Sequence, residues 1–380
     1  LKLRVKRNID LLVGQPLIWL LIPFARLFGL ILNRDHELKI SGRTLVLKMA
    51  GGGSLFIAYP ALKALKEHSD HPIDLLCTQS VAPFAKTLGI FDRIIVLDGS
   101  GIFAFAKSYL KYWFSHLFKY DTVINFEVHS RLATIISLFS LARNRIGYHR
   151  HDFNPFTSLN THSFYFNLQR SIPGSYEEVA RAVGADIPDS KELHESFVNI
   201  IENQYSIPEA YSNETYDIGI GAICSDLAPE RMMPHTYWRK FVGKRLSEIK
   251  KPIRIFLYGA PADKEIYEKM IREVFKDFNI EVINAAGFKP LGETILHMHK
   301  VLDEYWGIDT SLLHISRLLG VKSYLFWGPT DPSVYLKDFD FLESKVFYQK
   351  VSCSPCVHLT RYPPCLGKNI CMEFDFSQSL

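Results

Sequence analysis

The stretch TLVLKMAGGGSLFIAYPALKAL, residues 44–65, contains the features that decide the fold. It opens with a short apolar run that predicts a buried strand, and three consecutive glycines, residues 51–53, follow. Apolar side chains then recur at helical spacing, at Ala58, Ala61, Leu62 and Leu65. This order, a strand followed by a glycine turn and a helix, is typical of a βαβ unit, in which the helix connects two parallel strands.

The same alternation continues along the chain. Further short apolar strands, separated by amphipathic segments, are predicted at residues 73–77, 94–97, 122–126 and 145–148. A polar stretch at 186–213, which contains Pro188 and Pro208, interrupts the pattern. The strands then resume at 216–222, 253–258, 281–284, 301–306 and 324–327.

This pattern predicts an α/β fold of two Rossmann-like, doubly wound domains that face a cleft. We expect the first domain at residues 41–205 and the second at 206–380, after an N-terminal hydrophobic segment at 1–40. A chain of 380 residues with 47% hydrophobic residues can bury two cores. The net charge of +4 suits a phosphorylated substrate or an anionic membrane surface, and it is too small to indicate a nucleic-acid partner.

Residues 11–32, LLVGQPLIWLLIPFARLFGLIL, form the most apolar stretch. They just reach the roughly 20 residues that a transmembrane helix needs, but Pro16 and Pro23 interrupt the run and Arg26 lies inside it. No small-residue cleavage site follows, which disfavours a secretory signal. Trp19 and the flanking basic residues favour a helix that lies in a membrane interface, and a true span or a buried helix of the first domain are the alternatives.

Three loops at the carboxyl ends of predicted strands carry the candidate chemistry, because ligands bind there in doubly wound sheets. In the first, Lys48 to Ser54, successive glycines let the backbone approach a ligand, and the following helix adds a partial positive charge. Lys48 and Gly53 are therefore candidate binding residues, the alternative being a simple tight turn. No Lys-Ser or Lys-Thr pair follows, so the loop is not a P-loop.

The second loop contains Gly219 and Gly221 after a strand, but the third glycine of a dinucleotide fingerprint is missing. The acidic residue expected after the next strand is also missing, since that strand ends at Leu257, Tyr258 and Gly259. We therefore expect no NAD site.

The third loop, residues 307–314, reads GIDTSLLH, and its simplest interpretation is that Asp309 or Thr310 caps the next helix. The amides at the start of that helix would also point at the cleft, where a diphosphate could bind. His314 lies one turn further on the same side and would add a hydrogen-bond donor.

These residues resemble a known family, the ADP-heptose-type lipopolysaccharide heptosyltransferases of glycosyltransferase family 9. Its end signature is an aspartate, a threonine and a glycine, then a histidine, a strand and Gly-Pro-Thr-Asp-Pro. The matching positions are Asp309, Thr310, Ser311, His314 and 328–332. The resemblance extends over about residues 44–375 and includes the helix with Pro60, the Arg145 strand and a basic residue, Arg231, before Pro234.

The resemblance implies a GT-B fold and an inverting glycosyltransferase that needs no catalytic metal or other cofactor. The second domain would bind the nucleotide-sugar donor, an ADP-heptose-like molecule, and the first domain the acceptor, an envelope glycolipid such as lipopolysaccharide. The activity would lie at the cytoplasmic face of the bacterial inner membrane. The predicted donor-binding residues are Lys48, Gly53, Arg231, Asp309, Thr310, Ser311 and His314.

Two positions depart from the family pattern. The first loop of the family ends in glycine and aspartate, and this aspartate is the presumed base, whereas here Gly53 is followed by Ser54. A serine cannot act as a carboxylate base, and the nearest carboxylate on the same edge of the sheet is Glu127. We therefore name Glu127 and Ser54 as catalytic candidates, the alternative being that Glu127 pairs with Arg131 at a strand end. The other departure, Ser311 for glycine, matters little because a backbone amide does the binding.

Four cysteines, Cys353, Cys356, Cys365 and Cys371, crowd into the C-terminal region. This spacing can hold a structural zinc ion, while two disulfides or free thiols are the alternatives.

An alternative function is that of a non-catalytic protein with the same fold, which binds a nucleotide sugar or glycolipid and scaffolds other enzymes. The serine at position 54 favours this alternative. A third possibility, a sugar-nucleotide epimerase, is supported only by the fold.

Overall fold

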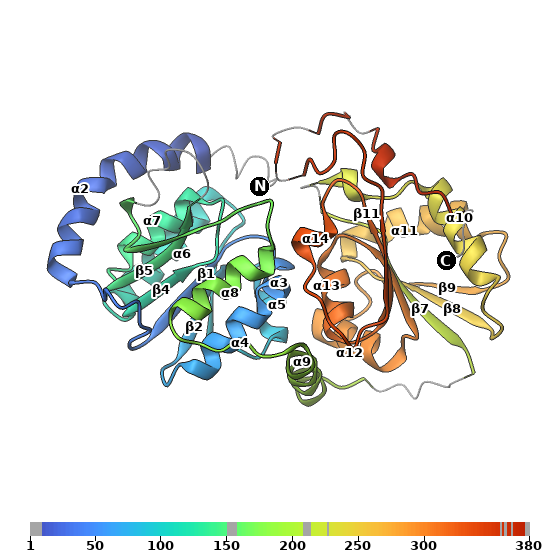
Figure 1. Cartoon of the computed structure of the whole chain (residues 1–380), viewed down its shortest axis with the longest axis horizontal. Helices are drawn as coiled ribbons and strands as arrows, with labels where there is room; N and C mark the ends of the chain where they lie inside the picture. The colour runs from blue at the N-terminus through green and yellow to red at the C-terminus, as the bar shows by residue number, and fades with distance from the viewer. Residues whose placement is uncertain are drawn as a thin grey trace. The chain divides into compact units, whose positions relative to one another are not determined.

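The computed structural model describes residues 10–149, 158–207, 214–225, 228–357, 359–360, 363–365 and 368–376. The chain divides into two compact units, Leu1–Pro188 (unit 1) and Asp189–Leu380 (unit 2), and each has its own sheet (Figure 1).

Unit 1 is built on a six-stranded parallel sheet with the order β3-β2-β1-β4-β5-β6. Its strands are β1 (Thr44–Lys48), β2 (Ile73–Thr78), β3 (Arg93–Leu97), β4 (Thr122–Asn125), β5 (Asn144–His149) and β6 (His162–Tyr165). The central strands β1, β2 and β4 are buried along their whole length, as expected for a parallel sheet covered on both faces. The strand order reverses between β3 and β4, so the carboxyl ends of β1 and β4 lie side by side.

Helices cover both faces of this sheet. On one face α4 (Tyr59–His68) packs against α8 (Ile172–Ala182). The short helices of unit 1 are α3 (Ser54–Ile57) and α5 (Ala82–Thr87). On the other face α6 (Ile102–His116) and α7 (Arg131–Phe139) join β1, β2 and β4 in one apolar cluster, to which they contribute Tyr112 and Ile136.

The N-terminal segment forms a π-helical turn, Asp10–Gly14, and then α2 (Gln15–Leu32), which lies on α7. Its inner face buries Ile18, Leu21 and Ala25 against apolar residues of α7 and Leu159. We expected residues 1–40 to form a segment separate from the first domain. The part of this segment that the structure describes packs on unit 1 instead (Figure 1).

Unit 2 repeats the plan with the strand order β12-β11-β10-β7-β8-β9, again all parallel. Its strands are β7 (Tyr216–Gly221), β8 (Ile253–Leu257), β9 (Glu281–Asn284), β10 (Glu304–Ile308), β11 (Lys322–Trp327) and β12 (Ser344–Tyr348). Its helices are α9 (Ser190–Gln204), α10 (His235–Leu246), α11 (Lys264–Met270), α12 (Leu291–Val301), α13 (Ser311–Leu318) and α14 (Pro332–Tyr335). The core is aromatic: Phe241 of α10 lies edge-on to both Trp306 and Phe326, with ring centroids 5.0 and 4.8 Å apart.

The boundary between the units differs from the expected one at 205. It falls between Pro188 and Asp189, because α9 packs on α12 and α13 and therefore belongs to unit 2.

Candidate active site

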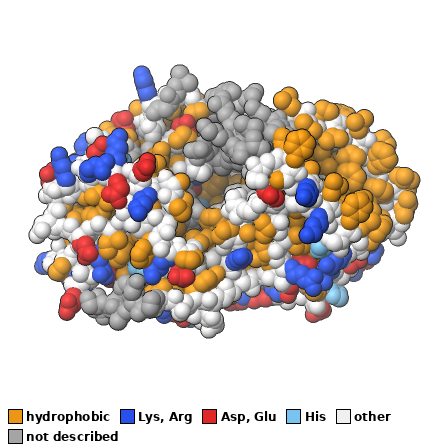
Figure 2. Space-filling view, turned by 180° about the vertical axis from the view of Figure 1, so that it is seen from behind, with side chains coloured by type: hydrophobic (Ala, Val, Ile, Leu, Met, Phe, Trp, Pro, Cys, Tyr) orange, Lys and Arg blue, Asp and Glu red, His pale blue; other side chains and the backbone are white. Residues whose placement is uncertain are grey.

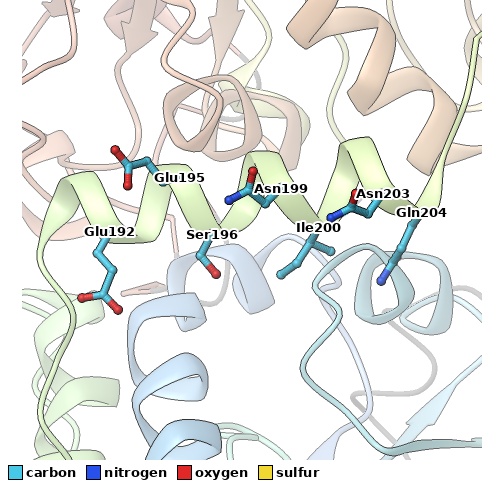
Figure 3. Close-up of a pocket in the computed structure, with 7 residues that line it drawn as sticks. All are labelled: Glu192, Glu195, Ser196, Asn199, Ile200, Asn203 and Gln204. Atoms are coloured by element: carbon cyan, nitrogen blue, oxygen red, sulfur yellow. The ribbon is translucent and has the colours of Figure 1, made fainter.

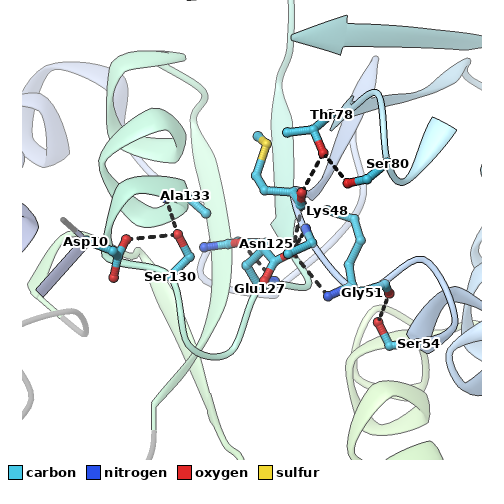
Figure 4. Close-up of polar contacts among 12 residues, drawn as sticks. Asp10, Lys48, Gly51, Ser54, Thr78, Ser80, Asn125, Glu127, Ser130 and Ala133 are labelled. Atoms are coloured by element: carbon cyan, nitrogen blue, oxygen red, sulfur yellow. Dashed lines mark hydrogen bonds and ion pairs between the residues drawn. The ribbon is translucent and has the colours of Figure 1, made fainter. Parts of the chain in front are cut away.

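The loop after β1 is shaped by its glycines. Gly51 adopts φ +71°, a left-handed conformation that side chains disfavour, and a Cβ at Gly52 would lie 2.1 Å from the Phe84 ring. The Ser54 hydroxyl turns back and donates to the Gly51 carbonyl at 2.6 Å. The loop is thus a tight turn into α3, and its hydroxyl closes the turn (Figure 4).

Glu127 lies at the carboxyl end of β4 and reaches across to this loop. Its Oε1 accepts hydrogen bonds from the amides of Met49 and Ala50, at 2.6 and 2.7 Å, and lies 3.1 Å from Lys48 Nζ (Figure 4). The side chains of Lys48 and Glu127 are each only 8% exposed. A carboxylate so deeply buried must be paired, and the two amides and the ammonium compensate its charge.

The geometry of Glu127 leaves one carboxylate oxygen available. All three contacts go to Oε1, and no hydrogen bond joins Oε2 to any residue that the structure describes. The backbone amide of Glu127 donates to Asn125 Oδ1 at 3.0 Å, which fixes the turn that carries the side chain. The alternative partner Arg131 is engaged elsewhere, since its Nε donates to Gln15 and its guanidinium lies 3.5 Å from Asp10.

In unit 2, three of the predicted residues, Arg231, Asp309 and His314, meet at the carboxyl end of β10, and Thr330 joins them. Arg231 Nη1 donates to the Asp309 carbonyl at 2.6 Å and lies 3.5 Å from its Oδ2. His314, in the helix α13 that begins two residues after Asp309, has its Nε2 atom 3.7 Å from Asp309 Oδ1. Thr330, after β11, donates its hydroxyl to Asp309 Oδ2 at 2.8 Å. Asp309 is therefore the centre of a polar cluster whose members come from three loops.

This cluster keeps Asp309 ionised although the residue is only 5% exposed. Burial by itself raises the pKa of the carboxyl group, but the His314 hydrogen bond, the Arg231 charge and the Thr330 hydroxyl outweigh it. The pKa of Asp309 consequently lies well below its ordinary value.

The start of α13 has an unused hydroxyl. Thr310 is its N-cap residue, but its side chain accepts no capping hydrogen bond. The Thr310 Oγ1 atom is buried, and within the described part of the chain it has no hydrogen-bond partner, although the Tyr305 hydroxyl is close. A buried polar atom without a partner costs free energy, so a ligand that bonded to it beside the helix N-terminus would be favoured. Ser311 follows as the first helical residue.

Gly219 and Gly221 have a packing role. A Cβ at Gly221 would lie 2.1 Å from the Tyr305 hydroxyl, and one at Gly219 would lie 2.5 Å from Leu302. These glycines make room for side chains of unit 2, which accounts for them without a dinucleotide.

The zinc expectation finds no support. All four cysteines of the cluster are free, and no three His, Cys, Asp or Glu side chains among the described residues are arranged to hold a metal ion. Burial raises the pKa of the Cys371 thiol to about 12, and the neighbouring thiols add to this shift. Burial likewise raises the pKa of Cys356. A high pKa opposes the thiolate form that binds metals.

One surface hollow, with a volume of about 490 Å³, follows α9 (Figure 3). None of the candidate residues lines it. Its lining comes entirely from this helix: Glu192, Glu195, Ser196, Asn199, Ile200, Asn203 and Gln204. One helix face offers no enclosed site, so we assign the hollow no role.

Sheet order and helix placement in both units are those of an α/β protein with the GT-B fold. Among solved structures, the glycosyl transferase family 9 protein of Veillonella parvula DSM 2008 matches with a TM-score of 0.59 and 18% identity, over 82% of this chain and 86% of that one. The E. coli ADP-heptose LPS heptosyltransferase II matches with a TM-score of 0.61 and 14% identity, over 86% of this chain and 97% of that one. The E. coli heptosyltransferase WaaC with ADP matches with a TM-score of 0.58 and 16% identity, over 80% of this chain and 93% of that one. No protein-family model and no curated protein matches the sequence.

Glu127 lies at the edge of the sheet where the sequence pattern predicts it, but its partner Lys48 was not predicted. Lys48 is also a predicted donor-binding residue, and its ammonium group binds Glu127 in this structure. Thr330 was seen only as part of a motif, and its bond to Asp309 was not anticipated. The available signal for both was that parallel strands bring their carboxyl ends together, so loops 48–54 and 127–130, or 309–314 and 328–332, had to be neighbours.

Proposed function

We propose that this protein is an inverting glycosyltransferase that moves a heptose or a related sugar from a nucleotide-sugar donor to an envelope glycolipid. The observation that carries the proposal is the position of Glu127. In place of the carboxylate that Ser54 lacks, a carboxylate from the neighbouring strand is bonded to the same loop. The likeness of the fold to heptosyltransferases supports the substrate class.

In this proposal unit 2 binds the donor diphosphate. The amides at the start of α13 and the Thr310 hydroxyl would bond to phosphate oxygens, and Arg231 and His314 would add charge or hydrogen bonds. Asp309 would hold Arg231 and His314 in place. These groups would stabilise the negative charge that develops on the departing nucleoside diphosphate, without a metal ion.

Unit 1 would activate the acceptor. A hydroxyl that attacks the anomeric carbon must lose its proton as the new bond forms, and Glu127 Oε2 would take that proton. Lys48 and the Met49 and Ala50 amides would hold the carboxylate through Oε1 and leave Oε2 for the acceptor. Attack from the face opposite the leaving diphosphate would invert the configuration at the anomeric carbon.

The test is product analysis with a panel of nucleotide heptoses and hexoses, each incubated with the protein and a lipopolysaccharide-type acceptor. We expect one donor to raise the melting temperature and to yield a product larger by one sugar residue, with inverted anomeric configuration. Transfer with retention, or hydrolysis or epimerisation of the donor alone, would contradict the proposal.

Ser54 also favours a second candidate, a non-catalytic protein that binds a nucleotide sugar or a glycolipid and scaffolds other enzymes. This second candidate function predicts that a donor raises the melting temperature of the protein while the acceptor gains no sugar from any donor in the panel. Since nucleotide sugars are cytosolic, either function would be exerted at the cytoplasmic face of the bacterial inner membrane.

A further inference from the structure

Helix α2 is apolar on its outer face as well as on its inner face. Its inner face packs on α7, as described above. The opposite face repeats large apolar residues at helical spacing, and all of them are exposed by 38% to 68%: Leu17, Leu20, Phe24, Leu27 and Ile31. A helix on the surface of a water-soluble domain normally carries polar side chains there.

Helix α6 shows the same feature independently. Tyr112, with the partly buried Phe105 and Tyr109, faces the sheet. On the outer side Phe103, Leu110 and Phe114 are exposed by 91%, 51% and 73%. These three residues are spaced by seven and four positions, so they form one stripe along the helix.

The two stripes belong to the same side of unit 1, because α7 connects the helices that carry them. The Trp113 indole of α6 donates to the Phe139 carbonyl of α7 at 2.7 Å, and Phe139 packs into the cluster beneath α2. From Ala133 to Leu138, α7 is buried. Figure 2 shows hydrophobic side chains gathered over the part of unit 1 where α2 lies. We call the outer faces of α2 and α6 together the α2–α6 surface.

The segments that form or support this surface carry basic residues and no acidic ones. The chain has 40 acidic residues, yet none of them lies in the segments 12–34, 102–120 and 131–143 that form or support the surface. The basic residues of these segments are Arg26, Arg34, Lys107, Lys111, Lys119, Arg131 and Arg143. Lys107 lies within the apolar stripe of α6, four residues after Phe103, and both Lys107 and Lys111 are exposed. Such a combination of apolar stripes and basic side chains is complementary to anionic lipid head groups above acyl chains.

We propose that the α2–α6 surface docks unit 1 onto an anionic lipid bilayer, with α2 and α6 lying in the interface plane. Residues Leu12–Leu32 are also long and apolar enough to cross a membrane. A crossing would carry the inner face of α2 away from α7 or pull α7 into the lipid, since Ile18, Leu21 and Ala25 are buried between them. A second copy of the chain is a poorer partner, because it would bring basic residues against basic residues.

Docking in this orientation has a consequence for the acceptor. Asp10, directly before α2, accepts hydrogen bonds from the amides of Arg131 and Leu132 at 3.0 and 2.8 Å, at the end of the loop that carries Glu127. One end of the docked surface therefore lies at the edge of the sheet where a lipid-linked acceptor would be needed. The inference rests on the proposed function only in making the acceptor a lipid.

The experiment measures sedimentation of the full chain with vesicles and uses no sugar donor or acceptor, so docking and transfer can fail separately. Vesicles of phosphatidylglycerol and phosphatidylcholine are compared with vesicles of phosphatidylcholine alone. We expect binding to the anionic vesicles only. Phe103→Ser with Phe114→Ser should weaken it by about tenfold or more, and Lys107→Glu with Lys111→Glu by at least about tenfold.

The matched control is Ile266→Ser with Phe288→Ser, two exposed apolar residues of unit 2 (45% and 61%), which should bind vesicles as the native protein does. Circular dichroism checks that each variant is folded. Carbonate extraction at alkaline pH should release the native protein from the vesicles. Unchanged binding of both α6 variants would overturn the proposal, and so would retention after carbonate extraction, which would indicate a membrane span.

Discussion

At the scale of single residues, two buried carboxylates, Glu127 and Asp309, are held by their neighbours in different ways. Glu127 is compensated by two amides and Lys48, and one of its oxygens stays available. Asp309 uses both oxygens, one toward His314 and one toward Thr330 and Arg231. The first arrangement suits a base, because a base needs an unused lone pair, whereas the second suits a residue that positions its neighbours.

Asp309→Asn should weaken donor binding. The change keeps the shape of the side chain but removes the charge that holds Arg231 and His314, so the donor dissociation constant should rise by about tenfold or more. Isothermal calorimetry with ADP and with the best nucleotide sugar measures it. The control is Asp303→Asn, just before the amino end of the same strand, β10, which should leave affinity unchanged. Equal affinities of the Asp309→Asn variant and the native protein would remove this loop from the donor site.

Asp309 should also make the free energy of unfolding depend on pH. Because its pKa in the folded protein is below the ordinary 3.8, the carboxylate stabilises the fold at pH values above that range, and this contribution disappears as the pH falls. The difference in free energy of unfolding between the native protein and Asp309→Asn should shrink as the pH falls below about 4. Urea titrations at a series of pH values test this. A difference that grows as the pH falls below about 4 would have the wrong sign.

At the scale of helices and strands, the alternating pattern predicted the central strands well, because buried parallel strands are continuous apolar runs. The strand expected at 301–306 begins only at Glu304, since α12 continues to Val301. The outermost strands β6 and β12 were missed. Their sequences, HSFY and SKVFY, include exposed and polar positions, so these two strands lack the apolar signal by which strands were predicted.

The candidate site, too, could be predicted only in part. Sequence motifs, and the tendency of ligands to bind at the carboxyl ends of parallel strands, predicted which loops carry polar residues, because these features are local. They could not predict that Lys48 would pair with Glu127, 79 residues away, or that Asp10 would bind the start of α7. Such pairings depend on side-chain packing, which strand and helix patterns do not specify.

Asp10→Ala should loosen the N-terminal segment from α7. The carboxylate bonds to two amides in the first turn of that helix and to the Ser130 hydroxyl, in the manner of a helix cap. We expect a loss of about 1–2 kcal/mol in the free energy of unfolding of unit 1. Chemical denaturation gives the free energy, and hydrogen exchange should show faster exchange of the Arg131 and Leu132 amides. Unaltered exchange there would mean that the contact does not persist in solution.

At the scale of the whole molecule, two units of the same design carry different chemistry at the carboxyl edges of their sheets. We propose that unit 1 contributes the base and the lipid-docking surface, and that unit 2 contributes the residues that bind the donor diphosphate. Because these groups lie in separate units, substitutions should remove lipid docking, transfer or donor binding one at a time.

Deletion of residues 1–34 should weaken vesicle binding and destabilise unit 1, because Ile135, Leu138 and Leu159 lose the helix that covers them. Each large apolar side chain that loses its burial costs about 1.5–3 kcal/mol. Calorimetry should show a lower melting temperature for unit 1, with the transition of unit 2 in place. Vesicle binding equal to that of the full chain would place the lipid contact elsewhere.

The turnover of Glu127→Gln with saturating donor and acceptor tests whether Glu127 is the base. Glutamine keeps the shape and the hydrogen bonds to the loop but cannot take a proton, so kcat should fall by at least about a hundredfold while donor affinity stays unchanged. Ser54→Ala, which removes only the hydroxyl bonded to Gly51, should keep near-native turnover. The opposite result, normal turnover in Glu127→Gln and its loss in Ser54→Ala, would contradict the account and assign the chemistry to the first loop.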